Sequence, residues 1–260
     1  MTEPSKQNIR AVSRALAVLN SFTQKRSQTL ADVTNATGLD KGTTRRLLIT
    51  LMDNGYVAQD PTTQQYRIGR ALRLLAADVP DGFDLRAVAS PVLTQLASEF
   101  PVTAFVSVYD DGDVVCLDRI HDMKGIEVHW WAVGGTLPYN CGGAPKLLLA
   151  FQPVEEIERV LTREPTAMTR ASITDRGALR DRLAQIRQQD YEFAVDDVTL
   201  GLTALAVPVR TPDGSIAGAI SIAGLTPQLC NEDGPDPLHL GQLREAARQI
   251  ERRIQMAGAA

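Results

Sequence analysis

The stretch "LADVTNATGLDKGTTRRLLITLMDN", residues 30–54, contains two helical patterns separated by the three residues "GLD". The first helix is expected over "LADVTNAT" and stops at Gly38, a residue suited to a helix C-terminus. The second begins at "DKGTT", where Asp40 is a plausible N-cap, and continues to Asn54. Two helices joined by a tight turn that contains glycine are typical of a helix-turn-helix unit.

The second of these helices has two different faces. Leu47, Leu48 and Leu51 share an inward face with Thr44. The outward residues near its start lie where a recognition helix meets base edges in the major groove; arginine and lysine donate to guanine, and threonine hydroxyls suit phosphates. The candidate DNA-contacting residues of this helix are Lys41, Gly42, Thr43, Thr44, Arg45 and Arg46. The segment "TTRR" alone would indicate an ordinary amphipathic helix, but its neighbours favour DNA binding.

The flanking sequence completes a winged helix-turn-helix domain over residues 8–69. Before the pair lies "IRAVSRALAVLNSF", an amphipathic helix. After it come two short strands, "YVAQD" and "QYRIG", joined by the turn "PTTQ". In this wing, Gln64 and Arg67 are candidates for contact with phosphate or a minor groove, although hairpin tips are commonly polar for solubility alone.

The remaining chain is expected to form a linker helix over residues 70–81 and a second domain over residues 82–256. Helices are expected in "LRAVASPVLTQLASEF", "PKLLLAF", "VEEIERVL", "RGALRDRLAQIRQQ" and "LGQLREAARQIERRIQ". Strands are expected in the hairpin "VTAFVSVYDDGDVVCLDRI", in "IEVHWWAV" (126–133), in "ALAVPVR" and in "IAGAISIAG". Strands flanked by helices, with hairpin connections in places, indicate a domain that mixes helices with a sheet.

Composition limits the classes of protein. The chain has 260 residues and a net charge of −4, but residues 1–80 hold 11 Lys+Arg against 6 Asp+Glu, so the basic N-terminal part contrasts with an acidic remainder. This difference in charge is typical of a protein that binds a polyanion with one of its ends, although the net charge of short segments also varies by a few units by chance. The absence of a long apolar run or secretory signal indicates a soluble cytoplasmic protein with no membrane partner. The sequence has an odd number of cysteines at irregular spacing: Cys116, Cys141 and Cys230. This pattern indicates neither a disulfide framework nor a CxxC metal-binding site.

A second stretch, "YNCGGAPKLLLA" (139–150), leaves several chemical interpretations open. A phosphate-binding loop is excluded because the motif GxxxxGK[ST] is absent, and no cofactor is expected. A nucleophilic Cys141 would need a base, and only His129 is near in the sequence. If Pro145 is the first helical residue, the N–H groups of Gly142, Gly143 and Ala144 lie at the positive end of a helix dipole. This arrangement favours the binding of a small anion at the start of the helix. One indole of the pair Trp130 and Trp131 is expected to face inward, either as a wall of the ligand site or simply as part of the core.

The chain resembles the isocitrate lyase regulator (IclR) family of bacterial transcription regulators nearly end to end. The resemblance rests on "VSRALAVLNSF", "LADVTNATGLDKGTTRRLLITLMDNGYV", "YRIG", "VVCLDRI", "LPYNCGGAPKLLLAF", "ITD", "LAQIRQQDY", "GLTALAVPV" and "AISIAG". It implies an α+β protein with an N-terminal winged helix-turn-helix, a linking helix and a C-terminal GAF-like effector domain, whose antiparallel sheet is flanked by helices. It also implies homodimers, often paired into tetramers, on palindromic double-stranded DNA operators.

The resemblance also carries over an effector pocket for a small carboxylate or aromatic acid. By position its residues are Trp130, Trp131, Asn140, Cys141, Gly142, Gly143, Ala144, Asp197, Ser221 and Ala223. This sequence departs from the family pattern at Asp40, Gly42 and Arg45 in the recognition helix. It departs again in the effector domain, where Asn140 replaces a histidine, Pro145 a glycine and Ala223 a serine. Operator and effector are therefore expected to differ from those of relatives.

These observations together predict a regulator, with repression of a catabolic operon by a homo-oligomer as the expected mode and a small organic acid as effector. Two other classes stay open at this point. One is a small-molecule enzyme with an accessory helix-turn-helix. Against this class, the sequence contains neither a set of nucleophile, base and orienting residue nor the residue spacing of a metal site. The other is a structural protein, which would leave the Gly142–Gly143 segment without a ligand.

Overall fold

A computed structural model describes residues 9–23, 25–77, 84–121, 127–128, 131–231 and 237–257. The chain divides into two compact units, Met1–Asp81 and Gly82–Ala260, and each is described by itself. Among the described helices, none is both long and apolar enough to cross a membrane.

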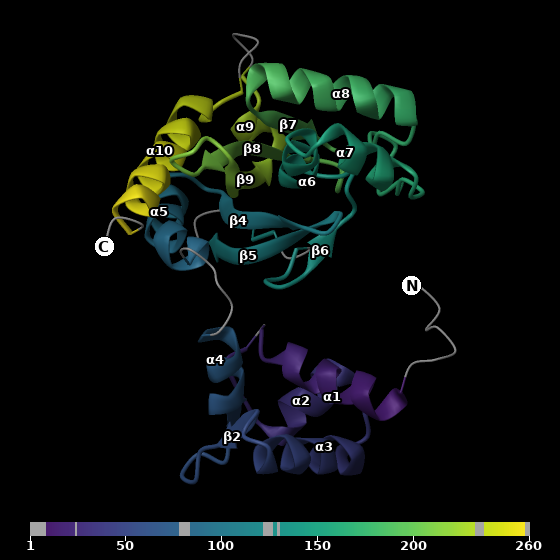
Figure 1. Cartoon of the computed structure of the whole chain (residues 1–260), viewed down its shortest axis with the longest axis vertical. Coiled ribbons are helices and arrows are strands. Elements are labelled where there is room, and N and C mark those ends of the chain that lie inside the picture. Colours follow the sequence, from purple (N-terminus) through teal and green to yellow (C-terminus); the bar gives the residue numbers. More distant parts are fainter. Residues whose placement is uncertain are drawn as a thin grey trace. The chain divides into compact units, whose positions relative to one another are not determined.

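The first unit contains the expected helices and wing (Figure 1). Its helices are α1 (Arg10–Ser21), α2 (Leu30–Thr37), α3 (Lys41–Asp53) and α4 (Arg70–Ala77). Its strands β1 (Ser27–Gln28), β2 (Val57–Gln59) and β3 (Tyr66–Ile68) form an antiparallel sheet in the order β1-β3-β2. The linker helix expected over residues 70–81 corresponds to α4, and residues 78–81 lie outside the described part.

Local sequence explains the start and end of the central helices. Thr29 and Asp32 form a capping box at the start of α2, because each side chain accepts a hydrogen bond from the other's backbone N–H. Gly38 ends α2 in the left-handed region at φ 64°, which costs glycine little. Asp40 then caps α3 by accepting from the N–H of Thr43 at 2.9 Å. The turn between the two helices is therefore specified by adjacent residues.

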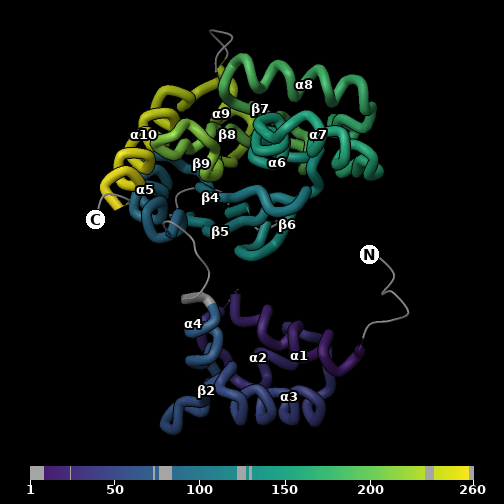
Figure 2. Tube along the Cα trace, in the orientation of Figure 1, coloured from purple at the N-terminus to yellow at the C-terminus, as the bar shows by residue number. Residues whose placement is uncertain are grey.

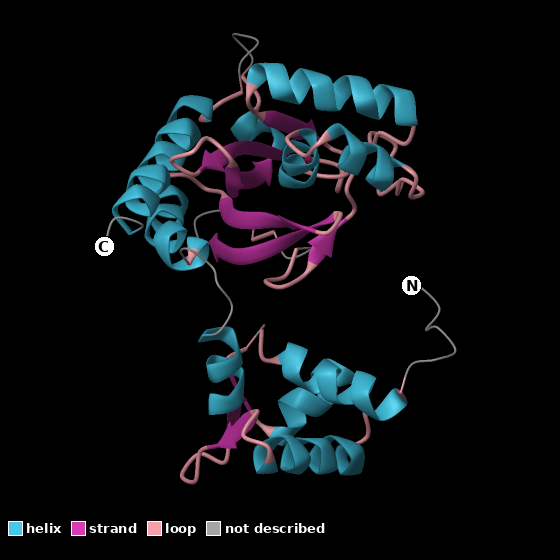
Figure 3. Cartoon of the chain, viewed as in Figure 1, coloured by secondary structure: helices cyan, strands magenta, loops and turns pink. Residues whose placement is uncertain are grey.

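The second unit is built on one six-stranded sheet in the order β6-β5-β4-β9-β8-β7, antiparallel at every pairing (Figure 3). Its strands are β4 (Thr103–Asp110), β5 (Asp113–His121), β6 (Thr136–Leu137), β7 (Glu192–Val195), β8 (Leu202–Arg210) and β9 (Ile216–Leu225). Its helices are α5 (Leu85–Glu99), α6 (Gly143–Ala150), α7 (Val154–Leu161), α8 (Arg176–Gln189), α9 (Thr226–Leu229) and α10 (Leu240–Ala257).

Helices cover both faces of this sheet (Figure 2). One face packs Ala104, Leu205 and Ile220 against α5 and α10. The other packs Phe105, Ala206 and their neighbours against α6, with α7 and α8 contributing to the same core. The expected α+β fold, with an antiparallel sheet flanked by helices, is confirmed.

Two local expectations are wrong. None of residues 127–128 and 131–133 is in a strand, although a strand was expected over 126–133. Trp131 is buried there, its ring stacks on Phe105, and its Nε1 donates to the Gly135 carbonyl at 3.0 Å, so a loop holds inward an indole that was expected to face inward from a strand. In addition, α6 begins at Gly143, so Pro145 is its third residue and not its first.

Candidate functional site

The α3 helix presents a basic face to solvent. Its inner side is anchored by Leu48 and Leu51, which are buried in the core of the first unit. Lys41, Arg45 and Arg46 are exposed on the other side. Within the described ranges, none of these three cations forms an ion pair, so their charge is available to a polyanion.

One residue predicted to contact DNA lies in the interior. Thr44 has no exposed surface, and its Oγ1 donates to the Asp40 carbonyl at 3.0 Å. Its side chain therefore stabilises the start of α3 and cannot reach a base in this arrangement. Gly42 is exposed and Thr43 is half-buried.

The wing places the other two predicted residues at the surface. Gln64 is exposed at the turn with φ 57°, and its Nε2 donates to the Pro61 carbonyl at 2.9 Å. Arg67 is exposed on β3, where it pairs in register with both Ser27 and Ala58. The wing thus contributes one further exposed cation to the surface of the first unit.

In the second unit, the two glycines before Pro145 serve the chain's own packing. Gly142 has φ 81°, a conformation that disfavours any side chain. A Cβ at Gly143 would lie 3.1 Å from the Cβ of Ala206, because α6 begins directly against β8. Gly143 therefore permits close approach of helix and sheet, and this helix start is occupied by protein on that side.

A carboxylate of this chain also lies at the start of α6. The N–H of Gly142 donates to Asp197 Oδ2 at 3.0 Å, and Lys146 Nζ donates to the same oxygen at 2.7 Å. Lys146 is also 2.7 Å from Glu192 Oε1, and Arg182 lies 2.7 Å from Oε2 of the same glutamate. The positive end of the helix thus holds an anion, but the anion is Asp197.

These charges are strongly buried. The side chains of Lys146, Glu192 and Asp197 are exposed by 3%, 0% and 5%. Burial lowers the pKa of Lys146, but Glu192 and Asp197 outweigh it and raise that pKa above its usual value. Lys146 therefore remains a cation, and removal of one partner would leave a buried charge uncompensated.

Asn140 holds a neighbouring loop in place. Its Nδ2 donates to the carbonyls of Thr166 and Ile173 at 2.8 and 2.9 Å, and its Oδ1 accepts from the N–H of Thr166 at 3.1 Å. The amide oxygen and both amide hydrogens are thereby used within the chain. Cys141 beside it is buried, and burial raises the pKa of its thiol. This shift opposes a nucleophilic role, which requires a thiolate.

The sheet beside α6 carries the remaining predicted effector residues. Ser221 and Ala223 are buried on β9, on the sheet face that packs against α6. Ser221 pairs in register with Phe105, on which Trp131 stacks at a centroid distance of 5.7 Å. Ala144 is also buried near the start of α6. Trp130 lies outside the described residues.

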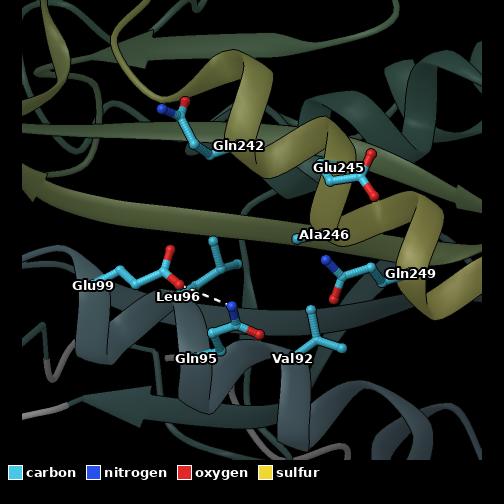
Figure 4. Close-up of a pocket in the computed structure, with 8 residues that line it drawn as sticks. All are labelled: Val92, Gln95, Leu96, Glu99, Gln242, Glu245, Ala246 and Gln249. Carbon is cyan, nitrogen blue, oxygen red and sulfur yellow. Dashed lines mark hydrogen bonds between the residues drawn. The ribbon is translucent and has the colours of Figure 1, made fainter.

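The opposite face of the sheet carries a separate groove between α5 and α10 (Figure 4). Its lining residues are Val92, Gln95, Leu96, Glu99, Gln242, Glu245, Ala246 and Gln249. Gln95 donates to Glu99 at 2.8 Å, and Glu245 pairs with arginines of α10. No residue predicted for the DNA or effector site lines this groove. Among the described residues, no group of His, Cys, Asp or Glu could hold a metal ion.

Sequence reasoning missed the buried ion cluster around Asp197. Lys146 gave a signal, because it is a lone charge inside the apolar helix segment "APKLLLAF". A lysine at such a position requires an anionic partner when it is buried. Its partners, Glu192 and Asp197, are distant in the sequence and could not be identified from spacing.

Comparison with known proteins agrees with both units. Residues 11–61 match the IclR helix-turn-helix domain, and residues 77–252 match the bacterial transcriptional regulator IclR C-terminal domain. The HTH-type transcriptional regulator XynR of Escherichia coli is 29% identical over 93% of this chain and 94% of its own length. The transcriptional repressor IclR of the same species is 28% identical over 86% of this chain and 82% of its own length.

Solved structures agree with the sequence relatives. An IclR homologue from Microbacterium hydrocarbonoxydans in complex with 4-hydroxybenzoate superposes with a TM-score of 0.72 at 25% identity, covering 95% of this chain and 99% of that one. The Thermotoga maritima IclR, at 20% identity and a TM-score of 0.67, has the same fold. The matched families and these relatives are transcriptional regulators and not enzymes. This chain therefore belongs to the IclR family of bacterial transcriptional regulators, with an N-terminal helix-turn-helix DNA-binding domain.

Proposed function

We propose that this regulator is a homo-oligomeric repressor of a catabolic operon and that a small organic acid bound in its C-terminal domain controls it. The DNA-binding part of this proposal rests on the exposed face of α3. There Lys41, Arg45 and Arg46 have no ion-pair partner among the described residues. With Gly42, Thr43, Gln64 and Arg67 they would contact the operator. Repression is supported by two relatives, the repressor IclR and the acetate operon repressor of Salmonella typhimurium.

The effector would bind on the α6 side of the sheet. Ser221 on β9 pairs in register with Phe105, whose ring stacks on Trp131. Ala223 belongs to the same core cluster as these rings, and Ala204 of β8, its partner in register, packs against that cluster. A planar acid suits a site with an aromatic wall and a few polar groups. The homologue bound to 4-hydroxybenzoate makes an aromatic carboxylate one candidate. Cys141 and Ala144 would line the site, and Asp197 would supply a polar contact.

The oligomer would form in part through α1. Ile9, Val12 and Leu16 recur at helical spacing, and they are 70%, 53% and 53% exposed. An apolar stripe of this kind on a soluble protein marks an interaction surface. A second copy of the chain is the proposed partner, because a two-fold dimer presents two recognition helices to a palindromic operator.

The proposal is tested on DNA from upstream of the chain's own gene. We expect a discrete footprint that persists at moderate salt and weakens when the cognate organic acid is added. Binding that is equal on unrelated DNA and collapses with salt would contradict the operator assignment. A footprint that no acid alters would contradict the effector assignment alone.

A further inference from the structure

An arginine-rich groove runs along α10 beside the end of β8. It consists of two cavities of about 320 and 380 Å³, which are continuous because both are lined by Arg210, Arg248 and Glu251. Arg244 lines one cavity and Arg252 lines the other. The chain beyond residue 80 is acidic overall, so four arginines in one place distinguish this arginine groove from its surroundings.

Two of the arginines are held in fixed positions by aromatic rings. The Arg210 guanidinium lies 5.1 Å from the centroid of the Phe151 ring and pairs with Asp190. The Arg244 guanidinium lies 5.5 Å from the centroid of the Tyr191 ring and donates to the carbonyl of the last residue of α8 at 2.9 Å. A cation that is already ordered loses little conformational entropy when it binds an anion.

The carboxylates in and beside the groove do not use all of this positive charge. Glu245 is shared by Arg248 and Arg252, each at 2.9 Å. Within the described part of the chain, Arg244 forms no ion pair. The groove and its rim hold four arginines against three carboxylates, so a net positive charge remains. Each guanidinium has five N–H donors, and the contacts described use at most two of them, so donors are available for another anion.

The spacing of the arginines on α10 matches an extended chain. Arg244, Arg248 and Arg252 follow one another at intervals of four residues, which is roughly 6 Å along a helix. Like charges at this spacing destabilise a helix, so an anion that faces the row relieves repulsion. In an extended peptide every second side chain lies on the same side, at intervals of roughly 6.6–6.8 Å. Carboxylates at alternate positions of an extended peptide can therefore face the three arginines in turn.

The backbone of β8 cannot extend the sheet into this groove. Among the described strands, β7 pairs only with Thr203–Ala206 of β8, so Val207–Arg210 has no neighbour on that edge. Pro208 has no N–H group, and the N–H of Arg210 already donates to Glu251 at 2.9 Å. A ladder of backbone hydrogen bonds is therefore blocked, and a bound segment must be held through its side chains.

We propose that the arginine groove binds an extended acidic segment of a partner protein, with carboxylates at alternate positions facing Arg244, Arg248 and Arg252. No residue predicted for the DNA or effector site lines this groove, so the contact adds a protein partner to those two ligands. The charge of the surrounding domain disfavours duplex DNA as the occupant, because the long polyanion would meet an acidic surface on both sides of the groove.

The test uses fluorescently labelled peptides on the full chain, with binding read by anisotropy at low ionic strength. One capped hexapeptide alternates three glutamates with three serines, and a second carries the same three glutamates in one block. The alternating peptide should bind roughly threefold or more tightly than the block peptide. Equal affinity of the two peptides, or no binding of either, would overturn the proposal. Displacement of the peptide by inorganic phosphate, but not by chloride at equal ionic strength, would assign the groove to a small anion instead.

Variants place the binding in the groove. Arg248→Gln should weaken the alternating peptide by roughly threefold, because it removes the central cation of the row. Arg253→Gln is the matched control, since it makes the same change on α10 at an exposed position outside the groove and should leave the affinity unchanged. Glu251→Gln should tighten binding, because it removes a competing carboxylate and keeps an acceptor for the Arg210 N–H. Equal weakening in Arg248→Gln and Arg253→Gln would show that only net charge matters and would refute the assignment.

Discussion

Arg45 is the residue from which base recognition can be tested most directly. It is exposed on α3, and its planar guanidinium group can donate to O6 and N7 of a guanine. We expect Arg45→Ala to cost about 1–3 kcal/mol at the operator and to relax the preference at one base pair. A binding assay against single-base operator variants measures both effects.

Lys25→Ala is the control for Arg45. Lys25 forms a surface ion pair with Asp32 at 3.0 Å, and its loss should leave the base preference unchanged. Wild-type affinity and base preference in Arg45→Ala would remove this arginine from the recognition surface.

The buried cysteines give a prediction about pH. Burial raises the pKa of the Cys116 thiol to about 12 and raises that of Cys141 as well. A thiol with a raised pKa stays protonated, and hence unreactive, as the pH rises through its usual value. Burial also raises the pKa of Cys230, but this cysteine is only half-buried. At pH 8 we therefore expect iodoacetamide to label Cys230 first and the other two only after unfolding, as read by peptide mass spectrometry. Rapid labelling of Cys141 in the folded protein would revive a nucleophilic role.

At the scale of elements, the start of α6 depends on one backbone conformation. Gly142 has φ 81°, where a side chain is strained whatever the space around it. We expect Gly142→Ala to lower the free energy of unfolding by roughly 1 kcal/mol or more. Gly241→Ala is the matched control, since its Cβ would meet open space near the start of α10 and should be neutral or stabilising. Urea unfolding measures both, and equal stability of the two variants would show that α6 tolerates another geometry.

The elements also show what sequence patterns can predict. The helix expected over "RGALRDRLAQIRQQ" matches α8 in both bounds, because Asp175 caps it and the apolar spacing is regular. The helix-turn-helix followed from Gly38 and Asp40 for the same local reason. In contrast, β7 was not predicted: it is short and begins with Glu192, whose burial depends on Lys146 and Arg182. Asp197 was predicted as a pocket residue, but its ion pair could not be, because long-range contacts leave no periodic signal.

At the scale of the whole molecule, assembly should depend on the apolar stripe of α1. Leu16→Glu puts a charge at a 53% exposed apolar position, so burial against a second copy would leave that charge desolvated. We expect a shift towards monomers in sedimentation velocity and weaker operator binding. Ala17→Glu is the matched control, since it adds the same charge at an exposed neighbouring position off the stripe. Equal assembly of the two variants would contradict an interface at this stripe.

The order of strands in the second unit has a consequence for how this domain folds. Hairpins β4–β5 and β8–β9 join segments that are adjacent in the chain, but Thr103–Ser107 of β4 pair with Ala219–Ala223 of β9. That central pairing must close a loop that contains most of the domain. The conformational entropy of this loop is lost before the strand contacts that stabilise the closed loop have formed. The two hairpins can form early, whereas the pairing of β4 with β9 limits the rate of refolding. Substitutions that weaken β4 against β9 should therefore slow folding more than they speed unfolding.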